Sequence, residues 1–338
     1  MTFDPDAAAL PGSGLFGLSC SPEDASVVVV PVPFDATTSY RRGAAKGPRA
    51  VLEASRQVDL FDRELGRPYE AGISMLDEDP QLVAWNAEAS VAAAPIIEAG
   101  GATAALAGQL ALVNRLTAAM CDRVLDTVDG LLGAKKKVVV LGGDHSVSLG
   151  AIRAHAARFD GLGVLHLDAH ADLRDAFEGF VHSHASIMRN VLASVPGVAR
   201  LVQVGIRDYG ESEAAFMDQQ GARIRAHFDA DLAAARLEGT PFAALGRAIV
   251  SDLPRDVYVS FDIDGLDPTL CPSTGTPVPG GLSFHEACFL LAEVVRSGRR
   301  IVGADLCEVA PHPSGDDDWD ANVGARLLYK LIGWMAKG

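Results

Sequence analysis

The sequence predicts one α/β domain of three layers, an α/β/α arrangement in which helices cover both faces of a mainly parallel β-sheet. Two observations support this class. Short runs dense in valine, isoleucine and leucine alternate with longer segments of helical periodicity, which is typical of βα units with a fully buried sheet. No internal repeat, low-complexity linker or block of charge divides the 338 residues. We therefore expect a single domain over residues 27–338, preceded by an N-terminal arm, residues 1–26.

Each predicted strand is a short run that is apolar at almost every position. Such runs are too short for helices, and their valine and isoleucine content favours extended backbone. In chain order the predicted strands are Val27–Val32, Lys137–Leu141, Gly163–Leu167, Arg200–Gly205, Asp256–Phe261 and Arg300–Leu306. The helices predicted between them include Gly47–Gln57, Ala104–Leu132, Pro241–Ser251, Ser283–Arg296 and Asp320–Ala336. The Ala-rich region 88–111 could instead be partly irregular.

The charge balance argues against polyanionic partners. The chain has 29 Lys and Arg against 44 Asp and Glu, a net charge of -15, which repels nucleic acid and anionic membranes and attracts small cations. The N-terminus has no basic start, and the longest uncharged stretch, around residues 99–114, is short for a membrane span. The five cysteines include no CxxC pair, as expected of free thiols in a reducing compartment. We expect a cytoplasmic protein without nucleic-acid or membrane partners, and we interpret the arm as flexible or loosely docked.

Three polar clusters directly follow three of the predicted strands. They are GGDHS (residues 142–146), DAHAD (168–172) and DIDG (262–265). Because ligand sites of open parallel sheets lie beyond the carboxyl ends of the strands, we expect the three clusters to converge on one site.

The converging side chains suit divalent metal ions. Carboxylates packed this closely would repel one another and lose hydration unless cations compensated them. The expected ligands are His145, Asp168, His170, Asp172, Asp262 and Asp264. Four carboxylates carry a charge of about -4, which two divalent ions would cancel, and an oxygen-rich set without thiolate favours manganese, with magnesium, iron, cobalt or nickel as alternatives. Two such ions can lower the pKa of a shared water, so the prediction is a hydrolase.

Other interpretations of these clusters stay open at this point. Each motif alone could serve turn or capping chemistry. A binuclear metallophosphoesterase uses similar elements, but in the opposite order and with a Gly-Asn-His motif that this sequence lacks. In a noncatalytic protein, the same site would serve only stability or regulation.

Motifs across most of the chain resemble the ureohydrolase family, the arginases and agmatinases. The match rests on GGDHS (142–146), DAHADLR (168–174) and SFDIDGLDP (260–268), and extends to PFDATTSYRRGAAKGPRA (33–50), TGTPVPGGLS (274–283) and GADLCEVAP (303–311). The resemblance implies an arginase-like fold with about eight parallel strands, a trimeric or hexameric homo-oligomer, and hydrolysis of a small cationic guanidino substrate to urea and an amine.

By position, the resemblance also implies a binuclear manganese centre. One ion would be held by His145, Asp168, Asp172 and Asp262, and the other by His170, Asp168, Asp262 and Asp264, so that Asp168 and Asp262 bridge. Glu308 matches the family carboxylate that orients the guanidinium group. A histidine after the second motif is expected to carry a proton, and His184 fits this position better than His182, although Ala185 replaces the usual glycine. Asp144 is a further catalytic candidate.

The resemblance favours agmatine as the substrate. The segment TTSYRRGAAKGPR (37–49) is more similar to agmatinases than to arginases, and so is the region 274–281. Arg174 favours the alternatives, arginine and 4-guanidinobutyrate, because it stands where arginases place an asparagine that helps to bind the amino-acid end. Facing the pocket, Arg174 would repel a distal ammonium and attract a carboxylate. Facing away, it would pair with Asp175 or Glu178.

Overall fold

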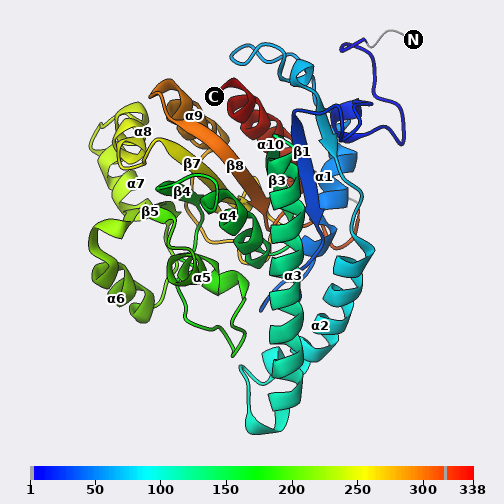
Figure 1. The fold of residues 1–338 in the computed structure, drawn as a ribbon. Helices are drawn as coiled ribbons and strands as arrows, with labels where there is room; N and C mark the ends of the chain where they lie inside the picture. The colour runs from blue at the N-terminus through cyan, green and yellow to red at the C-terminus, as the bar shows by residue number, and fades with distance from the viewer. Residues whose placement is uncertain (1–3, 316–317) are drawn as a thin grey trace.

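The computed structural model describes residues 4–315 and 318–338, and it confirms the three-layer architecture (Figure 1). One parallel sheet has the strand order β2-β1-β3-β8-β7-β4-β5-β6. Its strands are β1 (Val27–Val32), β2 (Ile73–Met75), β3 (Lys137–Gly142), β4 (Leu162–Leu167), β5 (Val198–Ile206), β6 (Ile224–Phe228), β7 (Asp256–Asp262) and β8 (Arg300–Cys307). The predicted eight-stranded parallel sheet is therefore present.

Helices pack on both faces of this sheet. One face is covered by α1 (Gly47–Ser55), α7 (Asp229–Leu237), α8 (Phe242–Ser251), α9 (Phe284–Arg296) and α10 (Trp319–Lys337). The other is covered by α2 (Pro80–Glu98), α3 (Ala107–Gly133), α4 (Ser148–Ala156), α5 (Ile187–Ser194) and α6 (Glu211–Gln220). Along β3, Val139 and Leu141 pack into the first core while Val138 and Val140 pack into the second. A strand buried on both faces is apolar at almost every position, which is the pattern seen in the sequence.

Six strands lie within two residues of their predicted ends, whereas β2 and β6 were not predicted. Both of these are edge strands. β2 is only three residues long, and β6 has the sequence IRAHF, whose polar residues reach partly exposed positions. Neither therefore has the continuous apolar run that marks an interior strand. Within the Ala-rich region, α2 continues to Glu98, and α3 begins at Ala107 after an irregular turn.

The second half of the N-terminal arm is docked on the domain, so the expectation of a loose arm is wrong there. Leu15 and Phe16 are buried in the core beside α1 and α10. The Phe16 ring packs edge-on against Tyr329, with 4.8 Å between centroids, and the Phe16 N–H donates to Ser55 Oγ at 2.9 Å. These two apolar side chains anchor the arm, although in the sequence they stand in a segment rich in Gly and Pro. The boundary between arm and domain at residue 27 remains a prediction.

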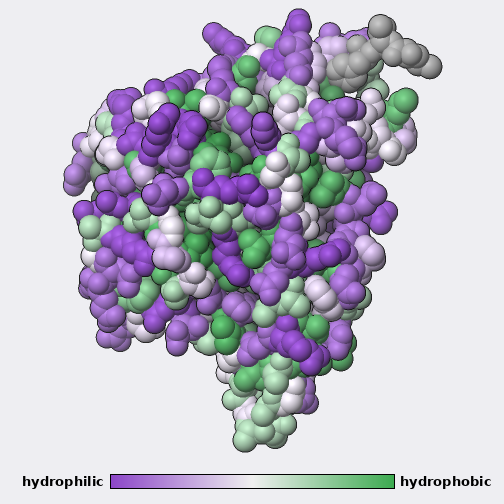
Figure 2. Space-filling view, in the orientation of Figure 1, coloured by the Kyte–Doolittle hydropathy of each residue, from purple (hydrophilic) through white to green (hydrophobic). Residues whose placement is uncertain are grey.

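Helices α2 and α3 form a hairpin that projects from the body of the molecule (Figure 1). Figure 2 shows that weakly hydrophobic residues predominate at its tip. By length and composition alone, the stretch Ala104–Gly133 could cross a membrane. In the fold it packs against α2 and α4.

His155, a buried histidine packed against β8, is expected to make the stability of the folded state depend on pH. The His155 ring of α4 lies against Gly303 of β8, where an added Cβ would stand 2.0 Å from Nε2. Nδ1–H donates to the Ala151 carbonyl at 2.8 Å, and burial lowers the pKa of His155 to about 4. The folded state therefore favours the neutral form of the His155 imidazole.

We expect the folded state to lose stability as the pH falls from about 6.5 towards 4, because a histidine in the unfolded chain takes up its proton near pH 6.5. A shift of this size corresponds to a loss of about 3 kcal/mol. Thermal unfolding of the wild type and His155→Gln across this range is the measurement. The amide of the variant does not titrate, so its decline should be shallower. Parallel curves would contradict the assignment.

Candidate metal centre and active site

The candidate site lies where four adjacent strands of the sheet end. β3, β8, β7 and β4 are neighbours, although β3 and β4 are consecutive in the chain and β7 and β8 come later. This reversal of strand order opens a crevice at the carboxyl edge, as in other open α/β sheets. The predicted ligands and Glu308 follow these four strands, so the fold brings together side chains more than 160 residues apart, such as His145 and Glu308.

The turn after β3 sets the position of His145. A Cβ at Gly143 would lie 1.8 Å from the Phe34 carbonyl oxygen, so only glycine fits this crossing. Asp144 then caps the short 3₁₀-helix that begins at His145, accepting a hydrogen bond from Ser146 N at 3.0 Å. Its second oxygen accepts from Thr37 Oγ1 at 3.1 Å. These contacts give Asp144 a structural role as a cap, and its catalytic role remains a prediction.

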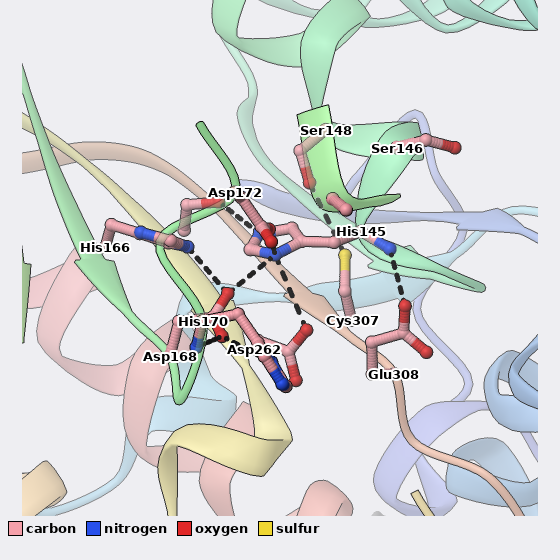
Figure 3. Close-up of polar contacts among 12 residues, drawn as sticks. His145, Ser146, Ser148, His166, Asp168, His170, Asp172, Asp262, Cys307 and Glu308 are labelled. Atoms are coloured by element: carbon pink, nitrogen blue, oxygen red, sulfur yellow. Dashed lines mark hydrogen bonds and ion pairs between the residues drawn. The ribbon is translucent and has the colours of Figure 1, made fainter. Parts of the chain in front are cut away.

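One half of the ligand cluster surrounds His145 (Figure 3). His145 Nδ1 lies 3.1 Å from Asp168 Oδ2, 3.1 Å from Asp172 Oδ2 and 3.5 Å from Asp262 Oδ2. Ligand atoms about 2.1 Å from an octahedral cation stand roughly 3 Å apart. The distances from His145 Nδ1 to the oxygens of Asp168 and Asp172 fit neighbouring ligands of one divalent ion, and Asp262 lies slightly farther away.

The other half surrounds His170. His170 Nδ1 lies 3.5 Å from Asp168 Oδ1 and 3.1 Å from Asp264 Oδ2. The two oxygens of Asp168 thus face different halves of the cluster, which is the arrangement of a bridging carboxylate. Asp262 presents Oδ2 to His145, while its Oδ1 accepts the backbone N–H of Asp264 at 2.9 Å. The bridging role of Asp262 remains a prediction.

Electrostatics supports a cation at this place. Burial, together with the neighbouring Asp264 and Asp168, raises the pKa of Asp262 well above its ordinary value. Burial and Asp168 raise the pKa of Asp172 to about 6. The two raised pKa values indicate that these carboxylates cannot all be ionised at once without a positive charge nearby. Divalent ions would supply that charge. The donor set of imidazole nitrogens and carboxylate oxygens fits manganese or a similar ion.

Glu308 lies beside His145 with one carboxylate oxygen available. Oε1 accepts the backbone N–H of His145 at 3.0 Å, whereas the buried Oε2 has no hydrogen-bond partner. Burial, together with Asp144, raises the pKa of Glu308 well above its ordinary value. The backbone of Glu308 is left-handed, with φ 61°, and Asp172 shares this conformation with φ 55°. Such backbone conformations are held only where the surroundings enforce them, often at functional sites.

A pocket of about 160 Å³ leads to the cluster from solvent. Its lining includes Ser39, His170, Asp172, Arg174, Phe177, His184, Asp208, Glu213 and Thr276. Of the two candidate proton carriers, His184 lines this pocket, and its Nδ1 has no hydrogen-bond partner. Burial, with the charges of His170 and His145, lowers the pKa of His184 to about 4.

Arg174 lines the pocket and also forms an ion pair with Glu213. It therefore combines the two arrangements considered from the sequence, in which it either faced the pocket or was paired with an acid. Its Nε lies 3.6 Å from Glu213 Oε2, and its guanidinium stands over the Phe177 ring at 4.7 Å. Asp175 and Glu178, the partners expected if Arg174 faced away from the pocket, are not its partners in the structure. Asp175 lies instead near Arg189, at 3.7 Å. The true partner comes from α6, a helix that the sequence pattern did not reveal.

Four further buried polar residues, which were not predicted from the sequence, lie next to the ligands. Ser260 Oγ lies 2.9 Å from His145 Nε2 and 3.0 Å from both oxygens of Asp305. His166 and Gln203 form a second set next to Asp168. A signal was present, because His166 and Ser260 each stand two residues before a ligand in a buried strand and therefore on the same face.

Comparison with known proteins identifies the family. A model of the arginase family matches residues 25–333. The chain belongs to the arginase family. It is a ureohydrolase, a hydrolase that acts on guanidino compounds.

Relatives extend over nearly the full length. An N(1)-aminopropylagmatine ureohydrolase of Thermus thermophilus is 37% identical over 322 residues, which are 94% of each chain. An agmatinase of Bacillus cereus is 29% identical over 313 residues, which are 93% of each. The crystal structure of the agmatine ureohydrolase of Thermoplasma volcanium has the same fold, with a TM-score of 0.74 and 23% identity over 97% of this chain and 96% of that one.

Removing a ligand carboxylate should abolish metal binding without unfolding the chain. We expect Asp262→Asn to lose one or both ions and nearly all activity, while its metal-free form unfolds at or above the wild-type temperature because repulsion among the acids is reduced. Metal content after dialysis and thermal unfolding with and without Mn²⁺ are the measurements. Asp267→Asn, on the following turn, is the matched control. Wild-type metal content in Asp262→Asn would contradict the ligand assignment.

Proposed function

We propose that this ureohydrolase cleaves agmatine or N(1)-aminopropylagmatine to urea and the corresponding amine at a binuclear manganese centre. The observation that carries the proposal is the free, buried Oε2 of Glu308 beside the ligand cluster. A guanidinium group has planar N–H donors that match such a carboxylate by charge-assisted hydrogen bonds. The pocket reaches the ligand cluster at His170 and Asp172.

The two ions would be held by the six ligands named above, with Asp168 shared between them. When bound, the ions supply Lewis acidity that lowers the pKa of the attacking water. Glu308 orients the guanidinium, and its own position is fixed by the hydrogen bond from His145 N. Cleavage of the carbon–nitrogen bond releases an amine that must gain a proton. His184 lines the pocket with its Nδ1 unpartnered, so this imidazole is placed to pass a proton to the amine.

The far end of the pocket supports a cationic rather than a carboxylated tail. Glu213 and the Phe177 ring offset the charge of Arg174, and Asp208 adds a further carboxylate to the lining. The 37% identical relative named for N(1)-aminopropylagmatine and the 29% identical agmatinase support the same substrate class. A carboxylated guanidine is the second candidate, and it is favoured by one observation: the Arg174 side chain lines the pocket and is 44% exposed.

Urea release from four guanidines in the presence of Mn²⁺ distinguishes these candidates. We expect kcat/KM for agmatine and N(1)-aminopropylagmatine to exceed that for arginine and 4-guanidinobutyrate by about 100-fold, as for a lost pairing of about 3 kcal/mol. Arg174→Gln should leave the KM for agmatine nearly unchanged because the charge of Arg174 is already offset. The opposite ranking, with Arg174→Gln weakening arginine binding, would move the assignment to carboxylated guanidines.

Substituting Glu308 tests the orienting carboxylate separately from the metal ligands. We expect Glu308→Gln to keep both ions but to lower kcat/KM by about 10- to 100-fold, because a charge-assisted hydrogen bond contributes about 1.5–3 kcal/mol. Steady-state urea release and metal analysis of the same preparations are the measurements. Loss of metal together with activity would instead make Glu308 part of the metal site.

A further inference from the structure

We propose that His166 and Gln203 are a pair of positioning residues that fix the orientation of Asp168, and that His166 is not itself a metal ligand. The inference rests on the binuclear centre of the proposed function. It concerns Asp168, a carboxylate whose two oxygens face different halves of the cluster. Any rotation of Asp168 would therefore disturb both ion positions at once.

The contacts form a chain from β5 through β4 to the ligand cluster. His166 is fully buried in β4, and its Nε2 lies 2.8 Å from Asp168 Oδ2 (Figure 3). Its Nδ1 lies 2.9 Å from the Gln203 side-chain nitrogen, on the neighbouring strand β5. The same nitrogen lies 2.8 Å from the Ala171 carbonyl oxygen.

These contacts determine where the His166 proton resides. A carbonyl oxygen can only accept, so the Gln203 group that faces Ala171 must be the NH₂. The second hydrogen of this NH₂ points at His166 Nδ1, which must then accept it. A neutral imidazole that accepts at Nδ1 carries its proton on Nε2, and His166 therefore donates to Asp168.

A ligand role for His166 conflicts with this arrangement. His166 is close enough to His145, Asp168 and Asp172 to be counted among possible ligands. To bind an ion, Nε2 would have to lose its proton, and Nδ1–H would then face the Gln203 NH₂ as donor against donor. Turning the amide over would place its oxygen against the Ala171 carbonyl. The pairing thus stabilises the tautomer that donates to Asp168.

The pair leaves Asp168 free to bind ions on both sides. Oδ1 accepts the His170 backbone N–H at 2.6 Å and Oδ2 accepts the His166 Nε2–H, so each oxygen has one fixed donor. A carboxylate oxygen has two lone-pair sites, and the second remains available for an ion. A neutral imidazole achieves this without adding positive charge beside the ions. Residues that hydrogen-bond to a metal ligand without binding the ion themselves commonly change the affinity for the metal.

Calorimetric titration of the metal-free chain with Mn²⁺ tests the inference. We expect His166→Phe to bind two ions per chain, as the wild type does, with an affinity lower by about 10- to 100-fold. His166→Gln, which keeps a donor near the Nε2 position, should recover most of the affinity. Gln203→Met should weaken binding in the same direction, because the tautomer is no longer fixed. His155→Phe, at a buried histidine away from the site, is the matched control.

The unfolding temperature of the metal-free variants separates positioning from packing. If His166→Phe lowers this temperature while the Mn²⁺ affinity stays at the wild-type value, His166 only fills the core and the inference is overturned. A fall from two ions to one at saturating Mn²⁺ would make His166 a ligand and would also overturn it. A wild type that binds no ion pair would overturn the centre, and the inference with it. Because these measurements use no guanidine, a wrong substrate assignment would leave their outcome unchanged.

Discussion

The crowding of buried carboxylates at one edge of the sheet is the constraint on which the rest of the structure depends. Asp168, Asp172, Asp262 and Asp264 are all buried around His145 and His170, and Glu308 lies beside His145. Such a group is unfavourable without counter-charge, because desolvation and mutual repulsion both oppose ionisation. Divalent ions bound here would offset both costs and thereby stabilise the folded chain. Metal binding and stability would then be coupled.

The backbone around the cluster is organised to bring the acids together. Gly143 lets the turn after β3 cross the segment that follows β1, and Gly265 lets the β7 turn approach the backbone of Asp168, where a Cβ would lie 2.7 Å from the amide nitrogen. Asp172 and Glu308 adopt left-handed conformations that are uncommon outside glycine. Such conformations persist only where the surrounding structure enforces them, so the geometry of the polar site depends on the fold around it.

The ligands could be predicted from sequence, whereas several of their partners could not. The ligands follow strands that are apolar at most positions, and the strand period decides which of them share a face. The edge strands β2 and β6 give no such signal, because they are short or partly exposed. Arg174 could be marked as important, but its partner Glu213 lies on a helix whose pattern is weak. The position of His166, two residues before Asp168, predicts that both side chains lie on the same face of the sheet. Its hydrogen-bonding role could not be predicted, because it depends on Gln203 from the neighbouring strand β5.

The two ends of the pocket are controlled by different parts of the fold. The ligands and Glu308 follow four interior strands, so substitutions that move these strands would also move the groups proposed to carry out the reaction. The outer lining comes from loops and from the start of α6, where Arg174 is 44% exposed and Glu213 is buried. Substitutions in this outer lining would alter substrate binding while the ligand cluster stays intact. The relatives at 37% and 29% identity are named for different guanidines. The case of Arg174 shows why specificity is difficult to infer from one residue: the charge that a substrate meets is that of Arg174 and Glu213 together.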